Sequence, residues 1–224
     1  MDKSVAEWSD SLPFWGQLRE TEREALAGAS VCSLYRAGAL LHAGQADCTG
    51  LYMVLDGQLR AFIVSDAGRE ITLYRLLALD ICLFSASCMF KDIQFDLSVQ
   101  AMSDTRALRI PADAYQHLME QSMPVALFTH QLMAARFSDV MWLLEQVLFK
   151  RFDTRLATFL LEQSNIDGAA RLALTHEEIA RHLGSAREVV SRMMKYFQSE
   201  GIVAMGRGEI DLIDFKKLRE LADG

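Results

Sequence analysis

The strongest constraint on the fold of this chain is residues 174–203, which read LTHEEIARHLGSAREVVSRMMKYFQSEGIV. Thr175 followed by Glu178 matches a capping box, in which two side chains satisfy free backbone N–H groups at the start of a helix. Ile179 and Leu183 recur at helical spacing and predict the inward face of that helix. The sequence therefore predicts a short, capped helix beginning at Thr175.

A second capped helix is predicted directly after the first. Gly184 supplies a tight turn, and Ser185 followed by Glu188 predicts another capping box. The predicted inward face of this helix consists of Val189, Met193 and Phe197, with Val190 as a further member. Two short helices joined at a glycine are the layout of a helix-turn-helix.

The outer edge of the second helix has side chains suited to reading base pairs in DNA. These predicted base-reading residues are Arg187, Glu188, Ser191 and Arg192. An arginine can donate two hydrogen bonds to guanine, a glutamate can accept one from cytosine, and a serine can approach a base edge or a phosphate. Ordinary core packing is the alternative interpretation of an amphipathic helix pair. The two caps, the glycine turn and the exposed charges together favour DNA binding.

A short β-hairpin, or wing, is predicted after the helix pair. Residues 202–205 and 209–213 are the predicted strands, and Gly206-Arg207-Gly208 is the predicted turn. An arginine at the tip of such a wing reaches a phosphate beside the groove. The predicted phosphate contacts are Thr175, Ser185, Lys195 and Arg207.

The overall charge gives a misleading view of this surface. The chain has a formal net charge of −7, although nucleic-acid binding normally requires a basic excess. From residue 151 onward, however, 11 basic residues face 12 acidic ones, so most of the acidity lies in the first 150 residues. Local clusters of charge must therefore decide the question.

Residues 31–109 have a different pattern, with short β-prone runs separated by glycines. The runs are LYMVL, LRAFIV, ITLYRL, LSVQAM and ALRI, and Asp56-Gly57 and Asp66-Ala67-Gly68 are hairpin signals between them. Regular short strands with glycine turns predict an antiparallel roll or barrel. Residues 8–30 before it are predicted to be helical.

A long helix is predicted from Val125 to Phe149, because this stretch contains no glycine or proline, and Pro111 and Pro124 are predicted to bracket a short helix before it. Apolar positions in the long helix recur at alternating spacings of three and four, as in a coiled coil. The predicted dimer interface is Met133, Phe137, Val140, Leu144 and Val147, and a second line is Leu127, Ala134, Met141 and Leu148. One edge could pack on its own roll while the other meets a partner helix. Burial of the whole helix within one subunit is the alternative.

A hinge is predicted at residues 149–153, with Asp153 as the N-cap of a new helix that extends to about Gln163. The chain is thus divided into a sensor roll (1–123), a dimerisation helix (124–150) and a winged helix-turn-helix (151–224). The predicted fold class is α+β.

This order of elements resembles the catabolite activator and FNR (Crp/Fnr) family of bacterial transcription regulators over nearly the whole chain. Glu188, Ser191 and Arg192 match the family's E-x-x-S-R base-reading pattern, and Arg187 matches an arginine that other members place just before the glutamate. The resemblance implies a roll like a cyclic-nucleotide-binding jelly roll and a homodimer on two-fold symmetric double-stranded DNA with TTGA-like half-sites. It also implies RNA polymerase and a small-molecule effector as partners.

Cyclic AMP and cyclic GMP are not the expected effectors. In the family's cyclic-nucleotide sensors, a glycine-glutamate pair holds the ribose and an arginine-serine pair holds the phosphate. Here residues 80–101 contain no glycine-glutamate pair, and Phe95-Asp96 stands where arginine-serine would be. A carboxylate at that position would repel a phosphate. We expect instead a different effector, or a redox signal, that controls DNA binding allosterically.

The effector pocket is predicted around a small, sulfur-bearing segment. Its candidate residues are Ser85, Ala86, Ser87, Cys88, Phe137 and Met141, although the segment could equally be a tightly packed turn. Haem is a possible cofactor, with His42, His117, His130, Cys88 or a methionine as axial ligand. An iron–sulfur cluster is not expected, because the four cysteines are dispersed and residues 1–31 contain none. We expect reduced thiols and no metal site.

Other functional classes find little support in the sequence. No P-loop, G-x-S-x-G or H-E-x-x-H motif is present, so we do not expect an enzyme. A regulatory ligand-binding subunit, or a winged helix that binds protein and not DNA, are the remaining alternatives. No apolar run is long enough to span a membrane, and the first residues are too polar for a secretory signal, so we expect a cytoplasmic protein.

Overall fold

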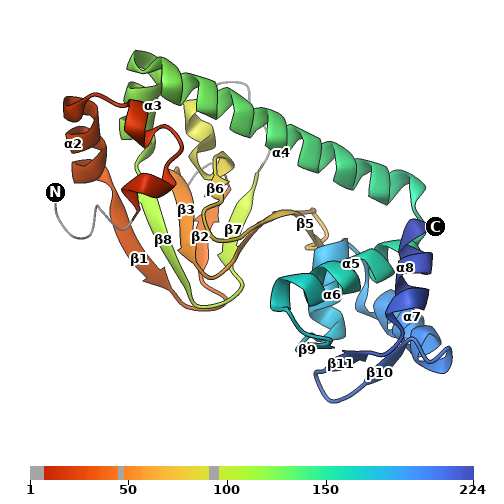
Figure 1. Cartoon of the computed structure of the whole chain (residues 1–224). Coiled ribbons are helices and arrows are strands. Elements are labelled where there is room, and N and C mark those ends of the chain that lie inside the picture. The colour runs from red at the N-terminus through yellow and green to blue at the C-terminus, as the bar shows by residue number, and fades with distance from the viewer. Residues whose placement is uncertain (1–7, 45–47, 91–95) are drawn as a thin grey trace. The chain divides into compact units, whose positions relative to one another are not determined.

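The computed structural model of the chain describes residues 8–44, 48–90 and 96–224 (Figure 1). The chain forms two compact units. The first unit comprises residues 1–63 and 73–140, and the second comprises residues 64–72 and 141–224. No helix within the described ranges combines the length and apolar character needed to cross a membrane.

The first unit is built around two four-stranded antiparallel sheets, in the strand orders β1-β8-β3-β6 and β2-β7-β4-β5 (Figure 1). The strands are β1 (Val31–Tyr35), β2 (Leu40–Ala43), β3 (Leu51–Asp56), β4 (Leu59–Val64), β5 (Glu70–Leu76), β6 (Ile81–Cys82), β7 (Ser98–Ala101) and β8 (Thr105–Ile110). The five runs predicted as strands correspond to β3, β4, β5, β7 and β8, which confirms the antiparallel roll. Gly57 joins β3 to β4 with a positive φ of 91°, and an added Cβ would lie 2.6 Å from the Asp104 carbonyl oxygen, so the turn requires glycine.

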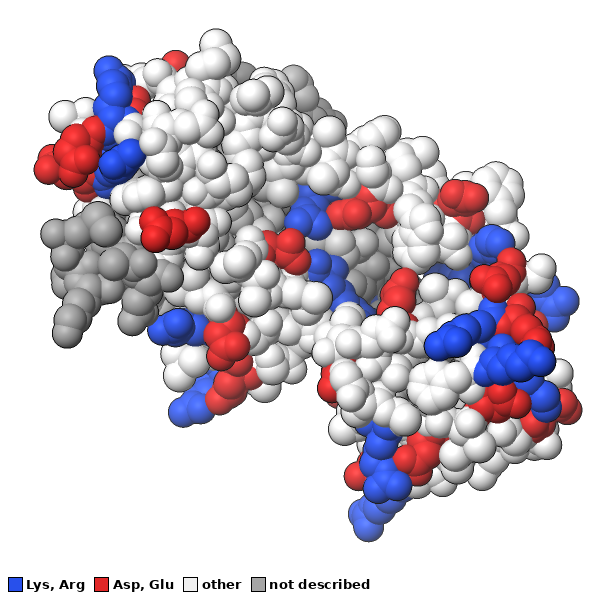
Figure 2. Space-filling model, in the orientation of Figure 1, with Lys and Arg blue, Asp and Glu red and all other residues white. Residues whose placement is uncertain are grey.

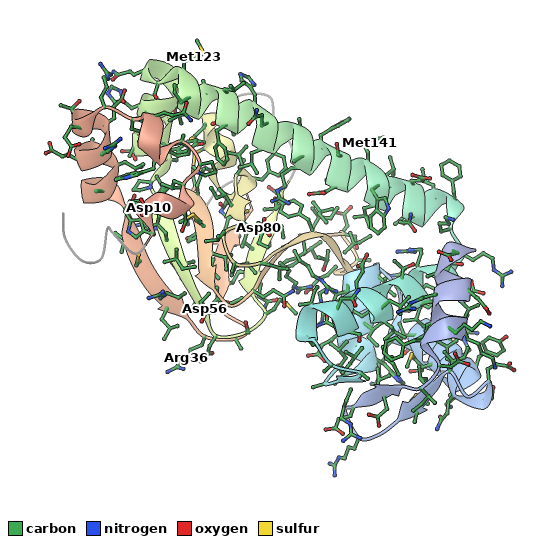
Figure 3. The ribbon with its side chains drawn as sticks, in the orientation of Figure 1. Asp10, Arg36, Asp56, Asp80, Met123 and Met141 are labelled. Carbon is green, nitrogen blue, oxygen red and sulfur yellow. A yellow bond between two sulfur atoms is a disulfide. The ribbon has the colours of Figure 1, made fainter. Side chains whose placement is uncertain are left out.

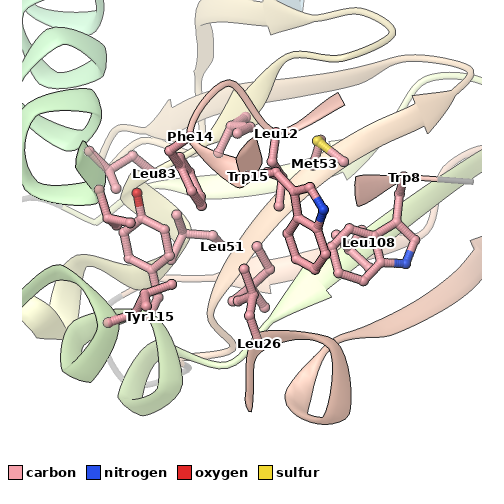
Figure 4. Packing of buried hydrophobic residues seen from close by; sticks show 14 of the residues in the cluster. Trp8, Leu12, Phe14, Trp15, Leu26, Leu51, Met53, Leu83, Leu108 and Tyr115 are labelled. Carbon is pink, nitrogen blue, oxygen red and sulfur yellow. The ribbon is translucent and has the colours of Figure 1, made fainter. Parts of the chain in front are cut away.

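The roll has two apolar cores. One lies between the sheets and includes Val54, Leu59, Leu76 and Val99. The other joins the β3–β8 face to the N-terminal segment and is shown in Figure 4. Here Trp8 and Trp15 meet edge to face with ring centroids 5.5 Å apart. The burial of both tryptophans anchors the helical start of the chain on the roll.

That helical start consists of η1 (Ser9–Ser11), η2 (Trp15–Gln17) and α2 (Glu20–Ala29). Two further helices of the first unit follow the roll, α3 (Ala112–Gln121) and the beginning of α4 (Met123–Phe149). The prediction that Pro124 lies outside the long helix was wrong, because α4 begins at Met123. A proline in the first turn costs no hydrogen bond, since the N–H it lacks would have no partner there.

The cysteines depart from the expectation of reduced thiols. Cys48 and Cys88 are joined in a disulfide with their Cα atoms 6.0 Å apart. Cys88 lies in η3 (Phe84–Met89), and Cys48 precedes β3. Spacing in the sequence could not reveal this pair, because 40 residues separate the two and the fold alone brings them together. Cys32 and Cys82 take no part in a disulfide.

The second unit is a small helical domain with a three-stranded sheet. Its elements after α4 are α5 (Phe152–Asp167), β9 (Arg171–Leu172), α6 (His176–Leu183), α7 (Arg187–Ser199), β10 (Val203–Met205), β11 (Ile210–Leu212) and α8 (Phe215–Asp223). The sheet order is β10-β11-β9, so β9 adds a third strand to the predicted wing. Leu160, Ile179, Met194 and Phe197 are among the fully buried side chains of its core.

The start of α5 differs from the prediction by two residues. The N-cap is Arg151 and not Asp153, which lies in the first turn. The Asp153 carboxylate accepts a hydrogen bond from the Thr154 N–H at 3.0 Å and pairs with the Arg151 guanidinium at 2.9 Å. A carboxylate in the first turn still interacts favourably with the helix dipole, which explains why an acidic residue occupies this position.

Candidate nucleic-acid interface

The first helix of the helix-turn-helix, α6, has the predicted cap. The Thr175 hydroxyl accepts a hydrogen bond from the Glu178 N–H at 3.2 Å, and the Glu178 carboxylate accepts one from the Thr175 N–H at 2.7 Å. The helix ends at Leu183, and its C-cap Gly184 forms the predicted tight turn with a left-handed φ of 64°. The first helix and the glycine turn are therefore confirmed.

The second helix, α7, begins later than predicted. Its N-cap is Ala186, and no side chain caps it, so the prediction of Ser185 as N-cap was wrong. The Ser185 N–H instead donates to the Ala180 carbonyl at 3.0 Å, because the residue belongs to the turn that closes α6. The free N–H groups at the start of α7 consequently have no side-chain cap and remain available to an anion such as a phosphate.

The inward face of α7 consists of Val190, Met194 and Phe197. The predicted Val189 and Met193 are only partly buried, so the buried stripe lies one position further along the chain than predicted, while Val190 and Phe197 are buried as predicted. Four charged residues on α7 are exposed, and they are Arg187, Glu188, Arg192 and Lys195. The predicted base-reading residues thus occupy one outward edge of a well-packed helix.

Ser191 is half-buried on this edge and is held by a residue that the sequence analysis missed. Its hydroxyl lies 2.9 Å from Nδ1 of His176, the first residue of α6. Burial, followed by the positive charges of Arg187 and Lys195, lowers the pKa of His176 below its usual 6.5. The ring is therefore neutral at pH 7. The H in the LTHEE motif was the available signal, but its partner is 15 residues away.

The wing places Arg207 at its tip, where the side chain is exposed between β10 and β11. A second arginine, which the sequence analysis also missed, braces the hairpin. The guanidinium of Arg171 on β9 donates to the Asp211 carboxylate at 2.6 Å and lies 3.9 Å from Glu209. Arg171 therefore neutralises two acidic groups of the wing, while Arg207 is left to meet solvent or a ligand.

Charge on the second unit is mixed and not uniformly basic. Figure 2 shows Lys and Arg side chains over the winged-helix elements, interspersed with acidic ones.

Beside the α7 edge lies a cavity of about 300 Å³ lined by Arg151, Asp153, Val189, Arg192, Met193 and Tyr196. Arg192 thus borders open space next to the start of α5, where Asp153 is paired with Arg151.

In the roll, the residues predicted for the effector pocket differ in exposure. Ser85 and Ala86 are fully buried and Ser87 is 8% exposed, whereas Phe137 is 66% and Met141 45% exposed. The Ser85 hydroxyl donates to the Cys82 carbonyl at 3.0 Å, as in a packed turn. Cys88 is in the disulfide. A pocket formed by these residues stays a prediction.

A largely buried arginine, Arg136, lies where α4 meets the roll. The Arg136 guanidinium pairs with Asp139 at 2.8 Å and with Asp80 at 3.8 Å, and stacks over the Tyr74 ring at 4.7 Å. Its Nε is buried and makes no hydrogen bond. Burial raises the pKa of Tyr74 well above its usual value, so the phenol stays protonated beside the cation.

The residues considered as haem or metal ligands are separated in the fold. His42 is buried on β2, His117 bonds Gln121 on α3 at 3.0 Å, and His130 is exposed on α4. Within the described part of the chain, no three His, Cys, Asp or Glu side chains converge as a metal site would require. Phe95, used above against a cyclic nucleotide, lies outside the described residues, whereas Asp96 lies within them.

Comparison with known protein families finds the same two modules. Residues 33–122 match a cyclic nucleotide-binding domain, and residues 154–221 match a Crp-like helix-turn-helix domain. A roll of this kind joined to a winged helix defines a transcription regulator that combines an effector-binding domain with a DNA-binding one.

The relatives are transcription regulators. The activator Anr of Pseudomonas aeruginosa is 31% identical over 182 residues, which cover 78% of this chain and 73% of that protein. The cyclic AMP receptor protein of Thermus thermophilus is 28% identical over 174 residues, covering 78% and 80%. A crystal structure of a Crp/Fnr-family regulator from Eubacterium rectale has a TM-score of 0.94 at 47% identity, covering 96% and 100%. The chain belongs to the Crp/Fnr family of transcription regulators, whose members are not enzymes.

Proposed function

We propose that this chain is a homodimeric, sequence-specific regulator that reads a two-fold symmetric DNA site with TTGA-like half-sites through α7. The observation that supports this most is the outward edge of α7, where Arg187, Glu188 and Arg192 are exposed on a helix with a fully buried opposite face. The His176–Ser191 hydrogen bond adds order to this edge, because it fixes the serine rotamer before any DNA arrives.

Each side chain on this edge has a role in the proposed complex. Arg192 donates two hydrogen bonds to a guanine, Glu188 accepts one from a cytosine, and Arg187 adds a further base contact. Ser191 approaches a base edge while its hydroxyl remains bound to His176. These contacts specify sequence, and they are placed by contacts to the phosphates.

The proposed phosphate contacts come from three places in the second unit. Lys195 lies on the α7 edge, Arg207 at the tip of the wing, and Ser185 in the turn between the helices. The hydroxyl and the N–H of Thr175 are both engaged with Glu178 in the α6 cap, so a phosphate at this position replaces one of these hydrogen bonds. Braced by Arg171, the wing holds Arg207 at a fixed distance from α7.

The proposed dimer interface is an apolar row along α4 that the chain leaves exposed. Intrachain packing uses Val125, Phe128, Leu132 and Met133, which contact the core of the roll. The exposed row, spaced alternately by four and three residues, is Met123, Leu127, His130, Ala134, Phe137, Met141, Leu144 and Leu148. This is the spacing of a two-stranded coiled coil. Figure 3 marks Met123 at the start of this row and Met141 in its second half.

This row refines the predicted interface. Phe137 and Leu144 belong to it and are 66% and 46% exposed, and Val147 beside it is 42% exposed. Met133 packs on its own roll and Val140 is only partly exposed, so both lie at the edge of the row. An exposed seam of large apolar side chains is costly in water and is covered when a second copy of the same helix packs against it.

The proposed effector is not a cyclic nucleotide. Asp96 stands near the position where that class of ligand requires an arginine-serine pair, and a carboxylate there opposes a phosphate. A haem-based or gas-sensing regulator of the same architecture remains the second candidate, with His42, His117 or His130 as the axial residue. The proposal also includes RNA polymerase as a partner and places the protein in the bacterial cytoplasm, the compartment that contains the DNA.

Selection from a random pool of DNA duplexes by the full-length protein tests this function. We expect enrichment of an inverted repeat whose half-sites are centred about one helical turn apart. Affinity for the selected site should fall steeply with salt, because phosphate contacts release counterions. Recovery of no sequence, together with DNA binding that is insensitive to salt or absent, would instead indicate a winged helix that binds protein.

A further inference from the structure

The disulfide between Cys48 and Cys88 joins two exposed residues of the roll. The other two cysteines lie in different environments. Cys82 is fully buried, where burial raises the pKa of the thiol and protects it from oxidants. Cys32 is exposed on β1 and forms no disulfide. The exposed pair is therefore the place in the described chain where a two-electron oxidant can make and a thiol reductant can break a bond.

The cysteine pair lies next to residues that share a hydrophobic core with α4. Cys88 lies near the end of η3, a segment shared by both cores of the roll, with Ala86 in one and Phe84 in the other. Met89 and Phe90, which follow Cys88, pack against the same core as Phe128, Leu132 and Met133 of α4. A covalent bond at Cys88 consequently fixes the end of a segment on which the dimerisation helix rests.

The setting argues against a purely structural role for the bond. A protein that reads DNA works where thioredoxin and glutathione keep thiols reduced, and disulfides there are usually transient or redox-sensing. A structural bridge would be shielded, whereas exposure makes exchange with other thiols possible. This step rests on the proposed function, because the reducing compartment follows from DNA binding.

We propose that Cys48 and Cys88 form a reversible dithiol–disulfide switch that changes the packing of η3 under α4 and thereby the DNA affinity of the dimer. A hydroperoxide is the oxidant. One thiolate attacks it to give a sulfenic acid and release water or an alcohol, and the second thiol displaces water to form the S–S bond. Two electrons and two protons pass from the thiols to the peroxide in total. A dithiol reductant reverses the step by thiol–disulfide exchange.

The first test measures the bond and its effect on α4 without DNA. Full-length protein is reduced with dithiothreitol or oxidised with hydrogen peroxide, free thiols are alkylated, and peptides are identified by mass spectrometry. We expect residues 48 and 88 to lose alkylation reversibly and together. Hydrogen exchange over residues 125–135 should slow at least threefold in the oxidised form. Failure to form this bridge, or unchanged exchange when it has formed, would overturn the switch.

The second test measures DNA affinity in the two states, with matched variants. Wild-type affinity for the selected site should differ at least fivefold between reduced and oxidised protein. The double variant Cys48→Ser/Cys88→Ser should differ less than twofold, while Cys32→Ser should respond like the wild type. Equal affinity of the two wild-type states would overturn the switch and leave the proposed function intact. Loss of specific DNA binding in every form would overturn the proposed function, and the exchange measurement would still decide the switch.

Discussion

The winged helix and the sensor roll of this protein differ in how clearly their residues indicate what each of them binds. On the winged helix, the predicted base-reading side chains lie within one stretch of chain, on one edge of α7. In the roll, the residues predicted to meet a ligand come from two separate elements, η3 and α4. DNA always presents the same phosphates and base edges, so its readers reuse a small set of side chains. Effectors vary in chemistry, so the fold of the roll does not by itself identify the ligand.

The prediction with the largest expected effect tests whether the two structural units also unfold independently of each other. Phe197 is fully buried in the winged-helix core, and Phe197→Ala should cost that unit about 3–5 kcal/mol of stability. Hydrogen exchange should then show lost protection within residues 154–221 and retained protection within 33–122. The control Tyr196→Ala removes an exposed neighbour and should have little effect. Loss of protection in both regions together would show one cooperative unit.

A second prediction concerns α4, which contributes residues to both units. Phe137→Glu places two carboxylates in the proposed seam, and an uncompensated buried charge costs about 3–5 kcal/mol. We expect monomers at micromolar concentration by analytical ultracentrifugation, with the fold retained because Phe137 is exposed within one chain. Gln131→Glu, an exposed change outside the apolar row, should leave the dimer intact. A Phe137→Glu dimer as tight as the wild type would place the interface elsewhere.

The strands and the exposed, charged edge of α7 could be predicted from sequence because their signals are local. Alternating apolar residues and glycine turns mark the strands, and Thr175 caps α6 through a partner three residues away. The predicted start of α7 was one residue too early. Serine is a favourable N-cap residue, but the backbone N–H of Ser185 already takes part in the turn that closes α6. When two neighbouring residues could each be the N-cap, the sequence alone does not show which one is, because the choice depends on the surrounding packing.

The rest of the site depends on contacts between distant residues. The disulfide, the His176–Ser191 bond and the bracing of the wing by Arg171 all join separate segments. On α4, apolar residues occupy both faces, so spacing alone could not tell which row meets the chain's own core. Met133 was assigned to the partner for this reason, although it packs on the roll.

The third prediction separates sequence reading from general attraction to DNA. Arg192→Ala should cost about 1–3 kcal/mol per half-site on the selected sequence and much less on a scrambled one. Arg207→Ala should weaken binding to both sequences alike and reduce the salt dependence by about one ion per protomer. Arg219→Ala, on exposed α8, is the control of equal charge. Fluorescence anisotropy measures all three, and equal losses on both sequences for Arg192→Ala would contradict its assigned role.

The smallest expected effect concerns the histidine behind the recognition edge. Because the pKa of His176 is lowered in the folded protein, acidification below about 6.5 protonates the unfolded state first. This contribution to stability is thus fully present above pH 6.5 and is lost as the pH falls from there through the folded-state pKa. Nuclear magnetic resonance should show His176 titrating below 6.5, and Arg187→Ala should move its midpoint upward. A midpoint above 6.5 would be inconsistent with a partly buried ring near the positive charges of Arg187 and Lys195.

The central claim is that two copies of α7 read the two halves of one DNA site. Sedimentation equilibrium of the full-length protein with an inverted-repeat duplex selected from the random pool tests it directly. The account predicts two protomers per duplex and an affinity about 10³-fold or more above that for a scrambled duplex. A single bound protomer, or equal affinity for the selected and scrambled duplexes, would contradict it.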